Sequence, residues 1–431
     1  MPPKSRFTRL DAFTKTVEDA RIRTTSGGIV TIVSLIVVLY LALGEWSDYR
    51  RIVIHPELIV DKGRGERMEI HMNITFPKLP CELLTLDVMD VSGEQQHGVL
   101  HGVKKVRLRP ASQGGGVIDT TALALHSKDE TATHLDPDYC GVCYGAAAPS
   151  NAEKAGCCNT CDEVREAYAQ ASWAFGRGEG VEQCEREHYS ERLDEQRQEG
   201  CRIEGDIQVN KVIGNFHFAP GRSFSNGNMH VHDLKNYWDS PVKHSFEHQV
   251  HQLRFGPQLP EDISLKHSKS SPWTNHHLNP LEESKQTTDD PNYNFMYFVK
   301  VVPTAYLPLN SKGHQEGSNN NLGSLGSAFD GSMETHQYSV TSHKRSLMGG
   351  DDAAEGHQER MHARGGIPGV FFSYDISPMK VINREERAKT FAGFLTGLCA
   401  VLGGTLTVAA AVDRGLYEGT TRLKKLQSKN L

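Results

Sequence analysis

The chain has 431 residues, a net charge of −6 and 23% charged residues. This length allows one large domain or two ordinary ones. The mildly acidic balance and the lack of an extended basic segment argue against a nucleic-acid-binding protein. The apolar residues are concentrated in two stretches, and these stretches determine the class of the protein.

The first apolar stretch predicts a transmembrane helix over residues 27–44. It reads GIVTIVSLIVVLYLAL from Gly28 to Leu43 and holds no charged residue. With its flanking residues it approaches the roughly 20 residues that a helix needs to cross a bilayer. A cleaved signal peptide is the alternative, because Ala42-Leu43-Gly44 resembles a small-residue cleavage site. The 26 residues before the stretch are longer than a usual signal-peptide n-region, so we favour a retained anchor.

The second apolar stretch, residues 390–412, predicts a second transmembrane helix. It reads TFAGFLTGLCAVLGGTLTVAAAV without a charged residue, and its glycines are typical of packed membrane helices. A buried core helix is the alternative, but a fully apolar stretch in so polar a chain argues against it.

Basic residues outside the two stretches predict the orientation of the chain. The positive-inside rule places the tails 1–26 and 413–431 in the cytosol and therefore residues 45–389 in a lumen. The basic residues of the two tails are Lys4, Arg6, Arg9, Lys15, Arg21, Arg23, Arg414, Arg422, Lys424, Lys425 and Lys429.

The cysteines provide independent evidence for this topology. Eight of the nine lie in residues 45–389, and Cys399 lies in the second apolar stretch. An even number confined to one segment indicates disulfides in an oxidising compartment. We predict a disulfide-stapled, partly helical insertion over residues 140–201, formed by Cys140, Cys143, Cys157, Cys158, Cys161, Cys184 and Cys201.

Two other interpretations fit the same cysteines. The spacing of the two CxxC pairs resembles a zinc ribbon, in which four thiolates hold a tetrahedral ion. Thiols in a lumen are oxidised, however, so disulfides are favoured over zinc. Cys158 and Cys161 lead into a predicted helix whose N-terminus lowers a thiol pKa, so a thiol–disulfide oxidoreductase is the alternative function. The vicinal Cys157-Cys158 pair and the missing βαβ pattern argue against it.

The segment between the two stretches predicts a mainly β domain. Short alternating or β-branched runs separated by turn residues are typical of a β-sandwich. A helix is expected over residues 161–175. The stretches 111–138 and 310–364 are rich in small and polar residues, and we expect exposed, disordered loops there. The predicted strand runs are 51–60, 68–76, 83–91, 103–110, 202–218, 292–308, 336–345 and 369–382.

All 21 histidines also lie between the apolar stretches. His230-Val231-His232 alternates like a strand, which puts both imidazoles on one face. A metal site fits that spacing, and scattered surface histidines fit it equally well. No carboxylate is placed beside them by the sequence, so we expect neither a metal nor a cofactor. Asn73-Ile74-Thr75 predicts glycosylation of Asn73, and no common catalytic motif indicates an enzyme.

Seven segments resemble one known family, in the same order along the chain. They include DAFTKTVEDARIRTTSGGIVTIVS (11–34), CCNTCDEVREAY (157–168) and VNKVIGNFHFAPGRSF (209–224). They are similar to the ER–Golgi intermediate compartment and ER-vesicle proteins, and within them to the larger, cysteine-rich paralogue. The resemblance implies a two-pass membrane protein with a luminal β-sandwich and two cytosolic tails. The remaining segments are 230–234, 297–306, 369–379 and 394–409.

The resemblance also implies a function. Such proteins cycle between the endoplasmic reticulum, the intermediate compartment and the cis-Golgi in COPII and COPI vesicles. They are cargo receptors that retrieve escaped residents of the endoplasmic reticulum, as a hetero-oligomer with a smaller paralogue. Their tails carry coat-binding signals, but Ser428 beside Lys429 leaves the dilysine signal incomplete here. The candidate tail signals are Leu416, Tyr417, Lys424, Lys425 and Lys429.

A cargo receptor must bind in one compartment and release in another, so its affinity must differ between two states. We expect Trp173 and Phe175 to form an apolar surface for cargo or partner; the alternative is that both pack onto the sandwich. We expect His217, His230 and His232 to make cargo binding depend on pH between roughly 6 and 7, since histidine titrates near pH ~6.5.

Overall fold

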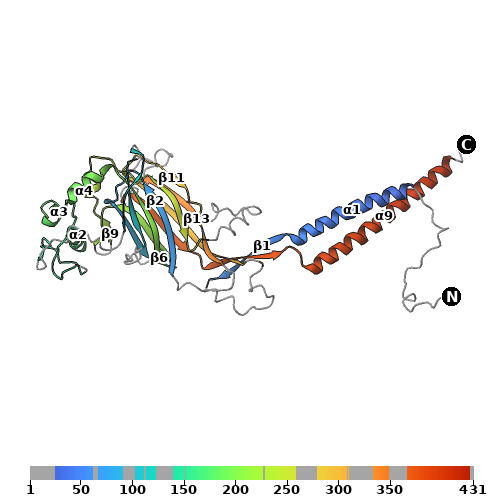
Figure 1. Ribbon diagram of the computed structural model, residues 1–431, viewed down its shortest axis with the longest axis horizontal. Coiled ribbons are helices and arrows are strands. Elements are labelled where there is room, and N and C mark those ends of the chain that lie inside the picture. Colours follow the sequence, from blue (N-terminus) through green and yellow to red (C-terminus); the bar gives the residue numbers. More distant parts are fainter. Residues whose placement is uncertain are drawn as a thin grey trace. The chain divides into compact units, whose positions relative to one another are not determined.

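The computed structural model describes residues 25–61, 67–90, 102–110, 113–122, 139–150, 152–226, 229–258, 279–307, 309, 333–348 and 366–427. The chain divides into two compact units (Figure 1). One is built from Met1–His55 with Glu385–Leu431, and the other from Pro56–Arg384.

The first unit holds two long helices that pack together, α1 (Thr25–Arg50) and α9 (Phe391–Gln427). Both are long and apolar enough to cross a membrane, with mean hydropathies of 2.4 and 1.9 and no burial of their apolar windows. Each helix continues past the predicted end of its span, at residues 44 and 412. At 1.5 Å per residue, α9 is about 55 Å long and exceeds a ~30 Å hydrocarbon core.

Aromatic side chains gather where α1 ends and α9 begins. The Tyr49 and Phe394 ring centroids lie 5.2 Å apart, and those of Trp46 and Phe394 lie 5.8 Å apart. The Lys389 ammonium donates to Glu45 Oε2 at 2.6 Å. Aromatic and charged side chains of this kind are typical of the membrane–water interface, so this end of the helix pair marks where the chain leaves the bilayer.

The second unit contains two stacked sheets. One is seven-stranded and comprises β1 (Ile52–Val60), β3 (Leu84–Asp90), β7 (Gly214–Pro220), β12 (Tyr293–Leu307), β13 (Met333–Ser346), β14 (Gly369–Ile376) and β15 (Met379–Arg387). Its order is β1-β15-β12-β14-β7-β3, with β13 on β12. The other is six-stranded and comprises β2 (Arg67–Phe76), β4 (Lys104–Leu108), β5 (Val117–Ala122), β6 (Gly200–Asn210), β10 (His248–Phe255) and β11 (Ser284–Gln286).

The core lies between these sheets because apolar and polar residues alternate along the strands. In β2, every second residue from Met68 to Phe76 is buried, whereas the residues between them are half-buried or exposed. The Phe76 ring meets the Phe218 ring of β7 at a centroid distance of 5.1 Å. Full burial of each such side chain contributes about 2 kcal/mol to stability. The predicted β-sandwich is therefore confirmed.

Several details differ from the prediction. The run 202–218 forms two strands, β6 and β7, and the run 369–382 divides into β14 and β15. The loop prediction is wrong at β5, inside 111–138, which is an exposed strand, and at the start of β13, inside 310–364. Strand β10 was not predicted, because a β-bulge between Val250 and Gln252 interrupts its alternation.

The insertion between β5 and β6 contains short helices. They are α2 (Cys161–Gln170), α3 (Glu182–Arg186), α4 (Tyr189–Glu195) and the 3₁₀ helix η5 (Gln196–Gln198). Helix α2 ends before the predicted Phe175, because Ser172 adopts a positive φ of 60° and Trp173 N–H turns back to donate to Tyr168 O. A two-stranded hairpin, β8 (Ser223–Asn226) and β9 (Met229–His232), follows β7, and α5 (Lys235–Trp238) follows the hairpin.

Candidate functional site

Eight cysteines of the described residues form four disulfides. The insertion is stapled as predicted, so the disulfide interpretation is confirmed there over zinc. Cys201 is a correction: it does not staple the insertion but joins β6 to Cys81, at the start of the segment that leads into β3. The bridges are Cys81–Cys201, Cys140–Cys157, Cys143–Cys158 and Cys161–Cys184.

The pair required for thiol–disulfide exchange is absent from this arrangement. Cys158 and Cys161 belong to different bridges, and both are buried. Thiol–disulfide exchange requires access of the attacking thiolate to a sulfur atom, and the sulfur atoms of both bridges belong to buried cysteines. The alternative function as an oxidoreductase using Cys158 and Cys161 therefore has no support in the structure.

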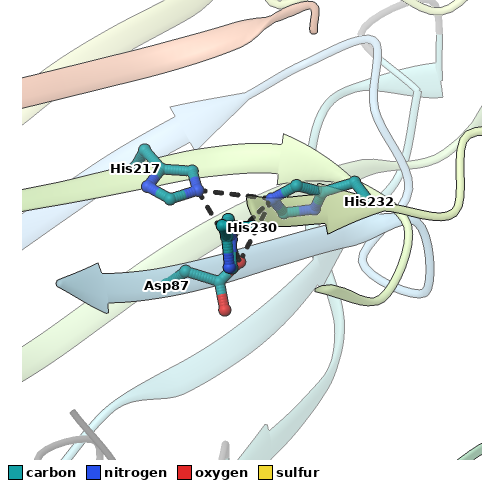
Figure 2. A group of neighbouring side chains, drawn as sticks. All are labelled: Asp87, His217, His230 and His232. Carbon is teal, nitrogen blue, oxygen red and sulfur yellow. Dashed lines mark hydrogen bonds and ion pairs between the residues drawn. The ribbon is translucent and has the colours of Figure 1, made fainter. Parts of the chain in front are cut away.

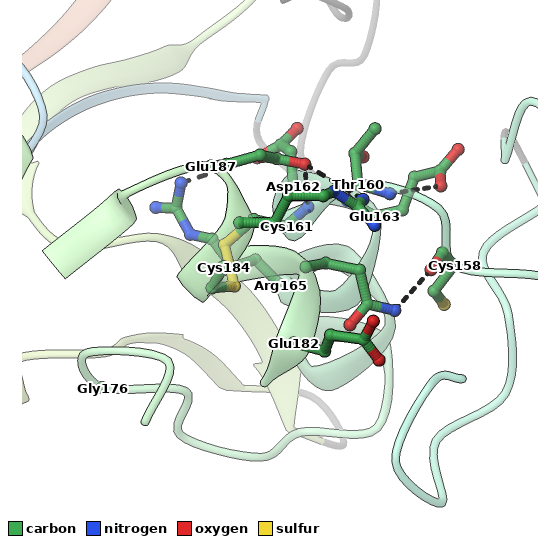
Figure 3. Close-up of a disulfide and its surroundings, with 12 residues drawn as sticks. Cys158, Thr160, Cys161, Asp162, Glu163, Arg165, Gly176, Glu182, Cys184 and Glu187 are labelled. Carbon is green, nitrogen blue, oxygen red and sulfur yellow. Dashed lines mark hydrogen bonds and ion pairs between the residues drawn. A yellow bond between two sulfur atoms is a disulfide. The ribbon is translucent and has the colours of Figure 1, made fainter. Parts of the chain in front are cut away.

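Helix α2 anchors the stapled insertion (Figure 3). Thr160 caps the helix by accepting from Glu163 N–H, and the Glu163 carboxylate accepts in return from Thr160 N–H at 3.1 Å. This capping box is the pattern expected of a threonine followed three residues later by a glutamate. The Cys161–Cys184 bridge then joins α2 to α3, which gives the insertion a defined shape without a large core of its own.

A small, open cleft lies where the insertion meets the β8–β9 hairpin. Trp173, one of the two predicted surface residues, is 45% exposed and contacts Tyr168 edge-on at 5.5 Å. Phe175, the other, is half-buried between Tyr168 and Tyr189. The cleft is lined by Glu82, Leu83, Arg165, Ala169, Trp173, Phe175, Gly176, Tyr189, Gly221, Arg222, Phe224, Asp233 and Asn236.

The charged residues of the cleft are paired. Arg165 Nη1 lies 3.2 Å from Glu82 Oε1, and its guanidinium stacks 4.8 Å above the centre of the Tyr189 ring. Arg222 Nη1 donates to Asp162 Oδ1 at 2.7 Å. These ion pairs neutralise the charged residues that line the cleft. The exposed Trp173 indole is therefore the main apolar contact surface of the cleft.

The hairpin and the insertion are joined through Asp233, the residue that follows β9. Its Oδ2 accepts from the backbone N–H groups of Phe175 at 2.8 Å and Gly176 at 3.0 Å. Its own N–H donates to Arg222 O at 3.0 Å and closes the base of the hairpin. The position of Phe175 and of the cleft lining around it therefore depends on the position of the hairpin.

Three histidines and one aspartate meet beneath the same hairpin (Figure 2). Asp87 of β3 and His217 of β7 are cross-strand partners and share the face of the seven-stranded sheet that points away from the core. His230 and His232 lie on the same side of β9, as the alternation predicts, and both contact Asp87 on this face of the sheet. The cluster thus unites residues that are far apart in the sequence.

The ligand atoms of the cluster are mutually close. His232 Nε2 lies 3.3 Å from His217 Nε2 and 3.1 Å from His230 Nε2. Asp87 Oδ2 lies 3.4 Å from His232 Nε2, 3.5 Å from His230 Nε2 and 3.8 Å from His217 Nε2. The other carboxylate oxygen, Oδ1, accepts from the Ser223 hydroxyl at 2.8 Å.

Burial determines the charge state of these groups. Asp87 and His217 are only 1% and 2% exposed. Burial raises the pKa of Asp87, but the hydrogen bond with His230 and the charges of His232 and His217 outweigh it and lower that pKa below its usual value. Burial lowers the pKa of His217 to about 4, and it also lowers the pKa of His232, against the opposing effect of Asp87. At neutral pH the Asp87 carboxylate is therefore charged, and the imidazoles of His217 and His232 are neutral.

Sequence reasoning missed Asp87. The sequence indicated surface histidines with no carboxylate beside them. For His217, His230 and His232 this expectation is wrong, because Asp87 lies within 3.8 Å of each. The alternating run LDVMDV places Asp87 on the face of β3 opposite Leu86 and Val88. That signal gives its face but not its neighbours, because pairing of β3 with β7 is a long-range property.

The remaining predicted sites lie elsewhere. Asn73 is half-buried on the outer face of β2, between β6 and β10, and its glycosylation stays a prediction. Leu416 and Tyr417 are exposed on α9, and Lys424 and Lys425 lie near its last turn. Lys429 is outside the described residues.

Two apolar helices that flank a disulfide-bearing β-sandwich define a two-pass membrane protein with one large extramembrane domain. The family described as endoplasmic reticulum vesicle transporter matches residues 143–413, and the family described as Endoplasmic Reticulum-Golgi Intermediate Compartment (ERGIC) matches residues 7–97. The chain belongs to this family of transport proteins between the endoplasmic reticulum and the Golgi.

Relatives cover almost the whole chain. The ER-derived vesicles protein ERV46 of Saccharomyces cerevisiae is 38% identical over 96% of this chain and 97% of its own length. The probable endoplasmic reticulum-Golgi intermediate compartment protein 3 of Dictyostelium discoideum is 40% identical over 98% of this chain and 97% of its own length. The crystal structure of Erv41p is 18% identical, with a TM-score of 0.37 over 77% of this chain and 99% of that chain.

Proposed function

We propose that this protein is a cargo receptor that cycles between the endoplasmic reticulum and the Golgi and retrieves escaped residents of the endoplasmic reticulum. Membership of a vesicle-transport family supports the pathway. The observation that carries the receptor role is the cleft beside the insertion, where Trp173 is exposed on a disulfide-stapled frame. A rigid, exposed aromatic with charged neighbours is typical of the anchor residues of protein interfaces.

In this role the sandwich lies in the lumen and both termini lie in the cytosol. The four disulfides support this, because such bridges persist in oxidising compartments. Protease added to sealed microsomes should remove the tails and leave residues 45–389 intact. Digestion of the sandwich in sealed vesicles would show the opposite orientation.

The proposal also includes a smaller paralogous partner and coat proteins. The family resemblance supports a hetero-oligomer, cycling through the intermediate compartment and cis-Golgi, and COPII or COPI contacts through the tails. Leu416 and Tyr417 are exposed on the same helix that continues from the second membrane span. Cross-linking in intact cells followed by purification of this chain should recover the partner, and replacement of both residues by alanine should reduce vesicle export.

The cargo role is tested at Trp173. Replacement of an interface anchor by alanine typically costs about 2 kcal/mol or more of binding energy, which is about a 30-fold loss of affinity. In cells that lack the wild-type protein, Trp173→Ala should release residents of the endoplasmic reticulum into the medium, as measured by quantitative mass spectrometry. The matched control is Trp238→Ala, since Trp238 is 44% exposed and lies outside the cleft lining.

The outcomes separate the two interpretations of Trp173. Normal retention by a folded Trp173→Ala variant would contradict the cargo surface. Loss of folding in that variant would instead assign Trp173 to the core. The predicted dependence of cargo binding on pH between roughly 6 and 7 does not hold for His217, because burial lowers its pKa to about 4, and burial lowers the pKa of His232 as well. The prediction is checked by cargo affinity at pH of roughly 6 and 7 for wild type and His230→Gln/His232→Gln, and a flat profile in the wild type would end it.

A further inference from the structure

We propose that Asp87, His217, His230 and His232 bind one divalent transition-metal ion, with zinc as the ion that the four donors fit best. The spacing of the donor atoms fits such an ion. Zinc binds imidazole nitrogen and carboxylate oxygen at about 2.0–2.2 Å in a tetrahedron, so neighbouring donors lie about 3.3 Å apart. Five of the six donor separations range from 3.1 Å to 3.8 Å, close to the edges of such a tetrahedron. The sixth, between His217 and His230, is within 4.8 Å.

The ring nitrogens outside the cluster orient the donors. His217 Nδ1–H donates to Asn215 Oδ1 at 3.0 Å, and His232 Nδ1–H donates to Gly221 O at 3.2 Å. A neutral imidazole that carries its proton on Nδ1 has a lone pair on Nε2. Both Nε2 lone pairs therefore point into the cluster, 3.3 Å apart. Two facing lone pairs repel, whereas a cation between them is stabilised by both.

The same contacts match the outer shell of known metal sites. Metal-binding histidines commonly donate their second N–H to a carbonyl or carboxylate, and ligating carboxylates are themselves hydrogen-bonded. Here Asn215 and Gly221 accept from two of the histidines, and Ser223 donates to Asp87 Oδ1. His217 is held further by stacking on Phe371, with ring centroids 5.0 Å apart.

The type and number of the ligands also indicate which ion binds and whether its role is structural or catalytic. Calcium and magnesium prefer oxygen ligands, whereas three imidazoles with one carboxylate suit zinc and its transition-metal neighbours. Four protein ligands complete a tetrahedron and leave no position for a reacting water, which is the pattern of a structural site. The ion would tie β9 to β3 and β7, and hence hold the hairpin on the sheet.

A metal ion that holds the hairpin on the sheet would also affect the cleft. The importance of this effect for cargo binding rests on the proposed cargo role. The β8–β9 hairpin presents Arg222, Phe224 and Asp233 to the cleft on one side and His230 and His232 to the cluster on the other. Metal at the cluster would therefore stabilise the wall that supports Trp173 and Phe175. Metal binding itself can be measured without any cargo.

The experiment uses the full chain purified in detergent, treated with a chelator, dialysed, and then incubated with Zn²⁺ or Co²⁺. We expect one zinc per chain by elemental analysis and the intense visible absorption of tetrahedral Co²⁺. His230→Gln/His232→Gln should lose both signals, with affinity reduced more than about 100-fold, because loss of one outer-shell partner alone typically costs about 10–100-fold. Asp87→Asn, which keeps the shape of the side chain, should weaken binding and alter the Co²⁺ spectrum.

Controls exclude adventitious binding and unfolding. His188→Gln should bind zinc like the wild type, since His188 is 73% exposed in the insertion and far from the cluster in sequence. Trp173→Ala should also keep its zinc, which separates failure of the cargo role from failure of the metal site. Circular dichroism should show an intact sandwich in each variant. Absence of stoichiometric metal in the wild type, or equal binding by folded His230→Gln/His232→Gln, would overturn the proposal.

Discussion

The cysteine-rich insertion and the β8–β9 hairpin meet at one cleft but are held in place by different chemistry. Three disulfides and a capping box hold the insertion. The hairpin has only four residues in each strand and is held to the sheet by polar side chains, chiefly the histidine–aspartate cluster. An isolated two-stranded hairpin is at best marginally stable.

The difference indicates a division of roles. Disulfides in an oxidising compartment are insensitive to modest changes of pH or metal concentration. Histidines and carboxylates respond to both, because protons and metal ions compete for the same lone pairs. The disulfides hold the insertion side of the cleft, whereas the proposed metal site would make the hairpin side respond to the supply of metal ions.

The largest expected effect comes from the disulfide that closes the longest loop. Cys81→Ala/Cys201→Ala opens a 120-residue separation, against 23 residues for Cys161→Ala/Cys184→Ala. Chain entropy then predicts losses of about 4–5 and about 3 kcal/mol in the free energy of unfolding. Urea unfolding of the full chain measures both. Limited proteolysis should show cleavage confined to the insertion in the second variant only, and equal cleavage patterns would contradict this division.

The next effect is the response of the sandwich to acid. His248 is buried between the sheets, where Nε2 lies 2.8 Å from the Tyr297 hydroxyl. Burial lowers its pKa from 6.5 to about 4, although Phe246 O and Glu247 oppose the shift. The unfolded chain therefore binds this proton first. The free energy of unfolding should fall between pH 6.5 and 4 by on the order of 3 kcal/mol, and should not change on this account above pH 6.5.

Two variants check this acid response. His248→Gln should reduce the slope of unfolding free energy against pH, whatever its cost at neutral pH. A slope should remain, because burial also lowers the pKa values of His217 and His336 to about 4. His188→Gln in the insertion should leave the profile unchanged, because the His188 side chain is 73% exposed. An unchanged slope in His248→Gln would show that this histidine does not couple folding to protons.

Two glycines with the same backbone angle compare the regions directly. Gly221 precedes the hairpin and Gly180 lies in the insertion, and each has a φ of +75°. A Cβ at Gly221 would overlap the Asp233 carbonyl oxygen, whereas one at Gly180 meets nothing within 4 Å. Gly180→Ala should cost about 1 kcal/mol through the left-handed conformation alone. Gly221→Ala should cost about 2 kcal/mol more through the clash; equal losses in thermal unfolding would contradict the close packing.

The smallest effect is the direct coupling between the regions. Arg222 at the base of the hairpin pairs with Asp162 on α2 at 2.7 Å. The pair is partly exposed, so its coupling energy should be about 0.5–1 kcal/mol. A double-mutant cycle with Arg222→Gln and Asp162→Asn isolates that energy. A value of zero would mean that the two walls of the cleft move independently of this ion pair.

Local sequence patterns predict much of the architecture. Uncharged runs of membrane-spanning length predict α1 and α9, and alternation of apolar residues predicts β2, β3 and β12. The crowding of cysteines predicts a stapled insertion. The limits of the helices were less predictable, because Arg414 and the residues after it continue α9 in polar surroundings where no apolar pattern marks the end.

The sequence by itself determined that this is a two-pass membrane protein with a β-sandwich, because those properties depend on composition and on short periods along the chain. Only the tertiary structure decided that Cys201 bonds to Cys81 and that Asp87 meets His217, His230 and His232. Both results need residues more than 100 positions apart to become neighbours, through pairing of β3 with β7 and the fold-back of the hairpin. Strand pairing over such distances is selected by burial of the whole core, which no local pattern records.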